Sequence, residues 1–168
     1  MLGSIDNDFM SLPPEVLSTA MKVHQKYFSI IDDKNKLAPK FLFVSNALPE
    51  ENRNISITEG NERVLRARLS DASFFWKVDI SKSSDHYNKK IKKVLFYEGL
   101  GSIFDKTLRI SKISNFFSTH FNVDASVAKE AALLSKADLA SEMVGEFPEL
   151  QGIMGGYYSK INLSLIHI

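Results

Sequence analysis

The chain of 168 residues contains no cysteine. It therefore cannot form disulfide bridges or a thiolate zinc site, and we expect a cytoplasmic location, because this composition is typical of a reducing compartment. Long apolar runs are absent too, since stretches such as FLFV at 41–44 are short, and we expect no membrane-spanning segment. The first residues, MLGSIDND, have neither the basic nor the apolar region of a secretory signal.

Common catalytic motifs are missing as well. The sequence has no G-x-x-x-x-G-K-S/T phosphate-binding loop, no H-E-x-x-H metal motif, no G-x-S-x-G nucleophile turn and no G-x-G-x-x-G dinucleotide motif. Its four histidines are scattered, and no two of them are four residues apart. We therefore expect this chain to supply no catalytic residue, no metal site and no cofactor-binding site.

The charges nearly balance, with 21 Lys+Arg against 20 Asp+Glu. The net charge of +1 excludes a globally basic nucleic-acid binder but leaves room for a local basic patch. Such a patch is indicated by residues 82–112, which hold eight Lys or Arg and three acidic residues. The adjoining stretch DISKSSDH, at 79–86, is polar and serine-rich, which favours a domain boundary there.

The first part of the chain mixes helix and strand signals. Prolines and a glutamate after Ser11 are typical of a helix N-terminus, and the helical pattern continues through LPPEVLSTAMKVHQ. Two short β-prone runs, 27–31 and 40–46, flank the polar stretch DDKNK and predict a β-hairpin. Residues 47–59 are predicted to be irregular, and an apolar stripe that begins after Gly60 predicts a further helix.

The second part carries helical patterns only. Residues 87–98 follow helical spacing, a longer helix starts near Gly101, and Asp124 is a typical N-cap for a third helix that continues to about Glu146. We therefore predict an α+β protein. Its expected parts are a mixed domain with a β-hairpin and helices at 1–80, an all-helical domain at 81–160 and a short tail at 161–168.

Two charged residues fall on apolar helix faces, Arg68 and Asp138. Burying an unpaired charge costs several kcal/mol, so each needs a partner. For Arg68 we expect an internal ion pair with Asp71, and the alternative is a contact with a phosphate or a partner carboxylate. For Asp138 we expect a hydrogen bond or a basic side chain such as Arg109, and the alternative is a metal ligand or general base together with Glu142.

Six basic residues are candidates for contact with a nucleic acid or a protein partner. Lysine neutralises phosphate groups without reading base sequence, and a helix face with arginine beside an exposed phenylalanine has the composition of an interface. The alternative is that these residues form the solvated faces of ordinary helices. The candidates are Arg63, Arg66, Lys89, Lys90, Lys92 and Lys93.

Four long stretches resemble the β subunit of the bacterial tetrameric glycyl-tRNA synthetases. They occur in the order found in that family, and together they cover about residues 2–160. The stretches are LGSIDNDFMSLPPEVLSTAMKVHQKYF at 2–28, GNERVLRARLSDASFFWKVD at 60–79, KKVLFYEGLGSIFDKTLRI at 92–110 and KADLASEMVGEFPELQGIMGGYYS at 136–159. Residues 161–168 do not resemble the family.

The resemblance implies a cytoplasmic heterotetramer of two α and two β subunits that attaches glycine to tRNA(Gly). In this family the α subunit holds the ATP, with Mg, and the glycine, while the β subunit mainly engages tRNA. The resemblance further implies that this chain is an internal fragment of the β subunit, without the catalytic centre. Its expected partners are the α subunit and tRNA(Gly), with no role for DNA or a membrane.

The second part of the chain also resembles the beginning of an HD-type helical domain. An HD phosphohydrolase needs an adjacent His-Asp pair for its metal, whereas the nearest acidic position here reads Lys136-Ala137-Asp138. We therefore expect a structural or tRNA-contacting use of this fold. The alternatives are a metal-dependent HD-type phosphohydrolase-like domain and a generic RNA-binding module.

Overall fold

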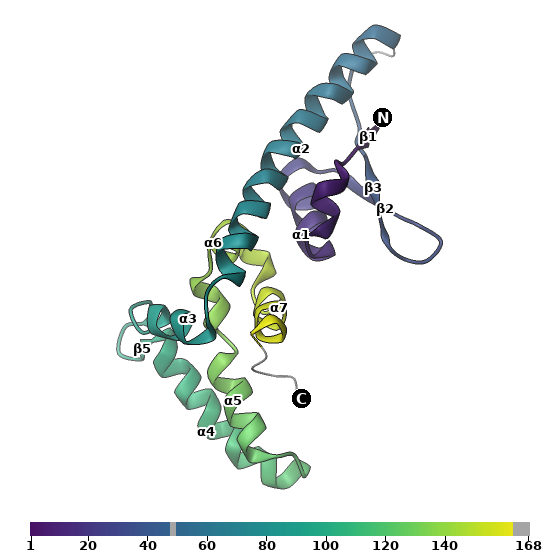
Figure 1. Ribbon diagram of the computed structural model, residues 1–168. Helices are drawn as coiled ribbons and strands as arrows, with labels where there is room; N and C mark the ends of the chain where they lie inside the picture. Colours follow the sequence, from purple (N-terminus) through teal and green to yellow (C-terminus); the bar gives the residue numbers. More distant parts are fainter. Residues whose placement is uncertain (48–49, 163–168) are drawn as a thin grey trace. The chain divides into compact units, whose positions relative to one another are not determined.

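The computed structural model describes residues 1–47 and 50–162 (Figure 1). The chain divides into two compact units, unit 1 from Met1 to Trp76 and unit 2 from Lys77 onward. This division lies four residues before the boundary predicted after residue 80. Helix α2 (Glu51–Ile80) contributes residues to both units.

Unit 1 contains a three-stranded antiparallel sheet of β1 (Leu2–Ser4), β2 (Phe28–Ile31) and β3 (Leu37–Leu42), in the order β1-β3-β2. Strands β2 and β3 form the predicted hairpin, which is confirmed. Strand β1 is not predicted, because three residues are too few to show an alternating pattern. Gly3 lies opposite the buried Phe41, and a Cβ at Gly3 would overlap the Phe41 ring.

The helical segments of unit 1 supply most of its core. Buried side chains from the first helix, such as Leu17, lie in the same core as Phe41 of the sheet and Leu65 and Leu69 of α2. Pro14 occupies the first helical turn, where its missing N–H costs no hydrogen bond. The segments before α2 are the 3-10 helix η1 (Asn7–Ser11), α1 (Pro14–Thr19) and the π-helix η2 (Ala20–His24).

The prediction that residues 47–59 are irregular is wrong over most of this stretch. Helix α2 already begins at Glu51 and continues without interruption through Gly60. None of its residues from Glu51 to Gly60 is classed as buried where burial is described, so this part of the helix has no apolar stripe to reveal it. Residues 48 and 49 lie outside the described residues.

Unit 2 is mostly helical. Helix α3 (Ser84–Ile91) leads into a two-stranded hairpin of β4 (Leu95–Tyr97) and β5 (Gly101–Ser102). Helices α4 (Ile103–Phe121) and α5 (Ala125–Leu134) then pack against each other as a helical hairpin (Figure 1). The remaining segments are η3 (Ala137–Ala140), α6 (Glu142–Glu146), η4 (Pro148–Leu150) and α7 (Ile153–Ile161).

Two helix predictions in unit 2 need correction. The helix expected over 87–98 ends at Ile91, and Leu95–Tyr97 forms a strand, so this part of the chain is not all-helical. The helix expected to reach Glu146 ends at Leu134 and is followed by short 3-10 and α segments. The long helix α4 and the N-cap at Asp124 are confirmed, since Asp124 accepts from the backbone N–H of Ser126 at 2.7 Å.

The left-handed Asn122, with φ 53°, ends α4 and turns the chain into α5. Across residues 1–47 and 50–162, no helix combines the length and apolar character that crossing a bilayer requires.

Candidate nucleic-acid interface

A buried carboxylate at the end of α2 holds the segments of unit 2 together. Asp79 is 1% exposed, and its carboxylate accepts four hydrogen bonds from residues of α3, α6 and α7. Two come from the hydroxyls of Tyr87, at 3.0 Å, and Tyr158, at 2.8 Å. The other two come from the backbone N–H groups of Glu142, at 3.0 Å, and Met143, at 2.9 Å, in the first turn of α6. These donors satisfy the buried charge and tie α3, α6 and α7 to one point.

The two tyrosines are suited to this role because they stay protonated. Burial raises the pKa of Tyr87, and the negative charge of Asp79 raises it further. The same causes, in the same order, raise the pKa of Tyr158. Both hydroxyls therefore remain donors to Asp79 throughout the physiological pH range, and their rings stack with centroids 5.9 Å apart.

Asp138 is also buried, at 1% exposure, and it is held by hydrogen bonds, which confirms one of the two partners expected for it and not the other, a basic side chain. Its Oδ2 accepts hydrogen bonds from the backbone N–H groups of Gly152 and Gly155, at the N-terminus of α7. Arg109, the expected partner, instead donates to the carbonyl of Leu100 at 2.9 Å. The helix that contains the expected apolar line ends before Asp138, so the carboxylate points to α7 and caps it.

The alternative of a metal site formed by Asp138 and Glu142 is not supported by the contacts of these two side chains. Glu142 is exposed and pairs with Lys90 at 3.4 Å, while Asp138 is bound by backbone N–H groups. Within the part of the chain that the structure describes, no three His, Asp or Glu side chains gather closely enough to hold a metal ion.

Arg68 lies at the margin of the buried stripe of α2. Leu65, Leu69 and Ala72 occupy the centre of this stripe, each at most 1% exposed. Arg68 is half-buried and Asp71 is exposed. This corrects the expectation that Arg68 is a fully buried charge, because a residue beside the stripe is not enclosed by it.

Of the two arginines proposed for contact in unit 1, one is already paired. The guanidinium of Arg66 binds both carboxylate oxygens of Asp6, at 2.7 and 3.3 Å. This hydrogen bond and the charge of Arg66 hold the pKa of Asp6 below its usual value. Arg63 is exposed and has no hydrogen bond or ion pair to any described residue. Arg63 is thus the more available of the two for an external partner.

The four lysines in α3 and directly after it are all exposed, and two of them have partners among the described residues. Lys90 binds Glu142 and also donates to the carbonyl of Ala140 at 3.4 Å. The ammonium of Lys92 lies 4.6 Å from the ring centroid of Phe104. Lys89 and Lys93 make no hydrogen bond or ion pair within the described ranges of the chain.

The β4–β5 hairpin follows this lysine cluster directly, and the helix prediction missed it. Leu95 and Tyr97 are 69% and 66% exposed. On the other strand face, the ammonium of Lys106 lies 4.1 Å from the ring centroid of Phe96. The signal that would have revealed the hairpin is the β-prone run VLFY followed by the turn sequence EGLG.

A capping box fixes the junction between the hairpin and α4. The hydroxyl of Ser102 accepts from the backbone N–H of Asp105, and the Asp105 carboxylate accepts from the backbone N–H of Ser102. The hydrogen bonds from Ser102 lower the pKa of Asp105. The Asp105 charge is therefore engaged at the helix N-terminus, where the charge of Arg109 also favours it.

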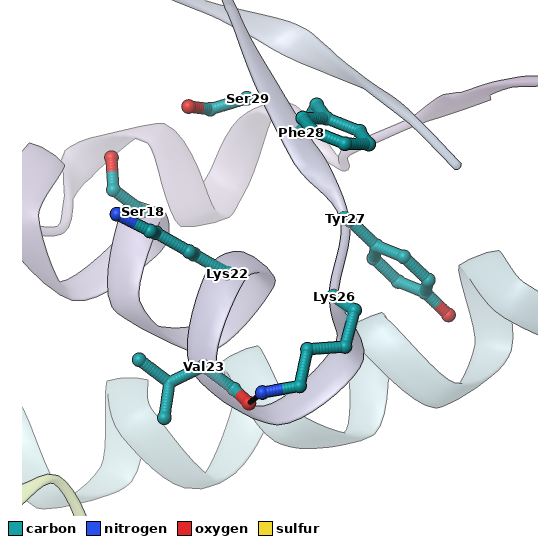
Figure 2. A pocket seen from close by; sticks show the side chains of 7 residues that line it. All are labelled: Ser18, Lys22, Val23, Lys26, Tyr27, Phe28 and Ser29. Atoms are coloured by element: carbon teal, nitrogen blue, oxygen red, sulfur yellow. Dashed lines mark hydrogen bonds between the residues drawn. The ribbon is translucent and has the colours of Figure 1, made fainter. Parts of the chain in front are cut away.

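Unit 1 carries a separate pocket of about 520 Å³ between the η2 segment and strand β2, which Figure 2 shows. Its lining includes the aromatic ring of Phe28 and two lysines, of which Lys26 donates to the carbonyl of Val23 at 2.9 Å. Lys22 extends along the helix toward Ser18. None of the residues proposed from the sequence lines this pocket.

Exposed lysines beside exposed aromatic side chains are typical of a surface that contacts nucleic acid. The chain belongs to the glycyl-tRNA synthetase beta subunit family, whose model matches residues 1–164. The matched range ends inside the segment 161–168 that was predicted to differ from the family, and residues 163–168 lie outside the described residues.

Individual relatives support this assignment. The chain is 46% identical over 159 residues to the glycine–tRNA ligase beta subunit of Pseudomonas entomophila strain L48. It is likewise 46% identical to the glycine–tRNA ligase beta subunit of Coxiella burnetii strain Dugway 5J108-111. Both matches cover 95% of this chain and 23% of the relative, so the chain spans about a quarter of the length of these relatives.

Proposed function

We propose that this chain acts as a segment of the β subunit of a glycine–tRNA ligase, which attaches glycine to tRNA(Gly) at the expense of ATP. The observation that carries this proposal is the family match over residues 1–164. The proposal includes an α subunit as partner, ATP and Mg bound by that subunit, two copies of each subunit and a cytoplasmic location. In this assembly the present segment provides scaffold and tRNA contact.

Lys89 and Lys93 are the residues through which we propose that unit 2 contacts the tRNA backbone. Both are exposed, and no described residue pairs with them. An ammonium group that is not engaged in the protein is free to neutralise a phosphate and release a counterion. Arg66 and Lys90 are less suitable, because carboxylates already bind them.

The experiment measures the affinity of the complete ligase, α and β subunits together, for tRNA(Gly) between about 50 and 200 mM salt. Reversing the charge in a Lys89→Glu/Lys93→Glu variant should weaken binding and flatten the plot of log Kd against log salt by about one unit per lost phosphate contact. Lys34→Glu, at another exposed lysine, is the matched control and should change neither quantity. An unchanged slope in the double variant would contradict the tRNA contact.

The assignment to a ligase is tested separately. The chain by itself should form no glycyl-adenylate, whereas the complete ligase should do so in the presence of ATP and glycine. Adenylate formation by the isolated chain would refute the proposal that the active site lies elsewhere. Failure of the complete assembly to charge tRNA(Gly) would refute the proposed reaction.

A further inference from the structure

The β4–β5 hairpin presents one uncovered apolar face. Side chains alternate between the two faces of a strand, so Leu95 and Tyr97 share a face and Phe96 lies on the other. Lys106 of α4 contacts the Phe96 ring, so the strand face that carries Phe96 is the one turned toward α4. Tyr97 is 66% exposed, and its ring makes no aromatic contact with any described residue. The aromatic ring of Tyr97 is thus accessible to solvent on a short hairpin.

The hairpin is held in place by its neighbours. The guanidinium of Arg109 on α4 donates to the carbonyl of Leu100 in the turn at 2.9 Å. The turn itself closes through a hydrogen bond from the backbone N–H of Leu100 to the carbonyl of Tyr97 at 3.0 Å. Gly99 and Gly101 supply the positive φ values, 78° and 80°, that this tight turn requires. The position of the Tyr97 backbone is therefore set before any partner binds.

Three cations lie at the hairpin and at the helix α4 that follows it. The ammonium of Lys106 lies over the ring of Phe96, and that of Lys92 lies over the ring of Phe104. The guanidinium of Arg109 binds a neutral carbonyl, so none of these three contacts is with an acidic group. Of the acidic residues in the same stretch, Asp105 is engaged in the capping box, and Glu98 is exposed in the turn. Among the described residues of this hairpin and its cations, Glu98 is thus the one acidic side chain that is exposed, and the stretch that carries Tyr97 is positive overall.

We propose that the ring of Tyr97 stacks on an unpaired base of the bound tRNA while Lys92, Lys106 and Arg109 neutralise the flanking phosphates. This inference rests on the proposed function and names a residue-level contact within it. A base in a double helix exposes only its edges, whereas an unpaired base offers a face on which an aromatic ring can stack. Stacking on aromatic residues combined with a positively charged surround is the usual mode of binding to single-stranded nucleic acid.

The charges favour RNA over a protein as the occupant of this face. Lysine is depleted at the centre of protein–protein interfaces, because its desolvation is costly. Here two lysines and an arginine contact the hairpin or the helix that follows it, so a protein partner would have to desolvate them. Phosphate groups on either side of a stacked base would instead pair with them.

The test compares Tyr97→Ala and Tyr97→Phe in the complete ligase, with tRNA(Gly) as the probe. Loss of one stacked base should raise the Kd of Tyr97→Ala by about 5- to 150-fold. Tyr97→Phe keeps the ring and should bind within about twofold of the unchanged enzyme. Because stacking carries no charge, the salt dependence of Tyr97→Ala should keep its slope, unlike that of Lys89→Glu/Lys93→Glu.

A photoreactive amino acid that replaces Tyr97 gives an independent test of the stacking. Its crosslinks to tRNA(Gly) should map to unpaired nucleotides. Unchanged affinity of Tyr97→Ala would overturn the proposal, as would crosslinks only to helical stems. The proposal would also be overturned, in favour of a protein contact, if Tyr97→Ala bound the α subunit more weakly but the enzyme, once assembled, bound tRNA(Gly) with unchanged affinity. A further outcome separates the two proposals. If Lys89→Glu/Lys93→Glu keeps the salt dependence of the unchanged enzyme while Tyr97→Ala binds tRNA(Gly) more weakly, the proposed backbone contact is refuted and the stacking is supported.

Discussion

The hydroxyl of Tyr158 donates a hydrogen bond of 2.8 Å to the carboxylate of Asp79, which lies 79 residues earlier in the chain. This contact links the last helix of unit 2 to the end of α2. With Tyr87 and the first turn of α6 it places four donors around a single buried charge. The short segments after α5 have few residues with which to stabilise themselves, so this shared carboxylate is a major source of their order.

Replacing Asp79 with asparagine should destabilise unit 2 strongly. An amide offers one acceptor oxygen and turns its NH₂ group toward two of the four donors, which leaves buried polar groups unpaired. We expect the free energy of unfolding to fall by about 2–4 kcal/mol. Urea denaturation followed by circular dichroism measures this change, and Glu130→Gln, at an exposed glutamate of α5, is the control that should stay close to wild type.

The same substitution at Asp138 should be milder. Only Oδ2 of Asp138 accepts hydrogen bonds, from Gly152 and Gly155, and among the described residues Oδ1 has no partner. The amide oxygen of Asp138→Asn can replace Oδ2, so we expect a smaller loss of stability than for Asp79→Asn. Asp138→Leu removes the acceptor altogether and should cost about 2–4 kcal/mol. Equal effects of the two asparagine variants in the same denaturation assay would contradict this account.

Stability should decrease at alkaline pH. Burial raises the pKa of Tyr87 and of Tyr158 in the folded chain, so unfolding allows both hydroxyls to ionise near the ordinary tyrosine pKa of about 10. Their contribution is present in full below that pH and is lost as the pH rises above it. The free energy of unfolding should therefore fall above about pH 10, by up to about 1.4 kcal/mol per pH unit for each tyrosine.

Guanidinium denaturation over a series of pH values measures this decrease. The double variant Tyr87→Phe/Tyr158→Phe should be less stable at neutral pH but should lose less stability above pH 10. A double variant with the same alkaline slope as the unchanged chain would assign the effect to other groups, such as Tyr27, whose pKa burial also raises.

Two glycine-to-alanine substitutions should have opposite effects. Gly101 has φ 80°, which an alanine adopts only with strain, and its Cβ would meet the carboxylate of Asp105. Gly101→Ala should therefore lower stability by about 1–2 kcal/mol. Gly60 lies within α2, with open space around the position of its Cβ, so Gly60→Ala should raise stability by about 0.5–1 kcal/mol. Thermal unfolding of both variants tests the pair.

Local patterns predicted those elements whose signals are contained in a few consecutive residues. The hairpin of β2 and β3, the helix α4 and the N-cap at Asp124 all carry such signals and are confirmed. The start of α2 was missed, because its first turns bury no apolar stripe. Helical spacing wrongly predicts a helix at Leu95–Tyr97, because short apolar runs fit both periods and what decides between them is the pairing of this strand with β5.

The partners of the charged residues could not be predicted in the same way. Arg66 binds Asp6, sixty residues earlier in the chain, and Asp79 binds the N-terminus of α6. Neither pairing follows from helical spacing, which brings together only residues three or four positions apart. The expected pair of Arg109 with Asp138 was plausible by charge alone, but each side chain reaches backbone groups instead.

The family, the mixed α+β class and the position of the basic stretch can all be predicted from the amino-acid sequence, because they depend on residue identity and order along the chain. The pairing of each cation, the burial of Asp79 and Asp138 and the exposure of Tyr97 on a hairpin are visible only in the folded chain. The physical reason is that burial and pairing are properties of groups that meet in space, and folding brings those groups together from distant parts of the chain.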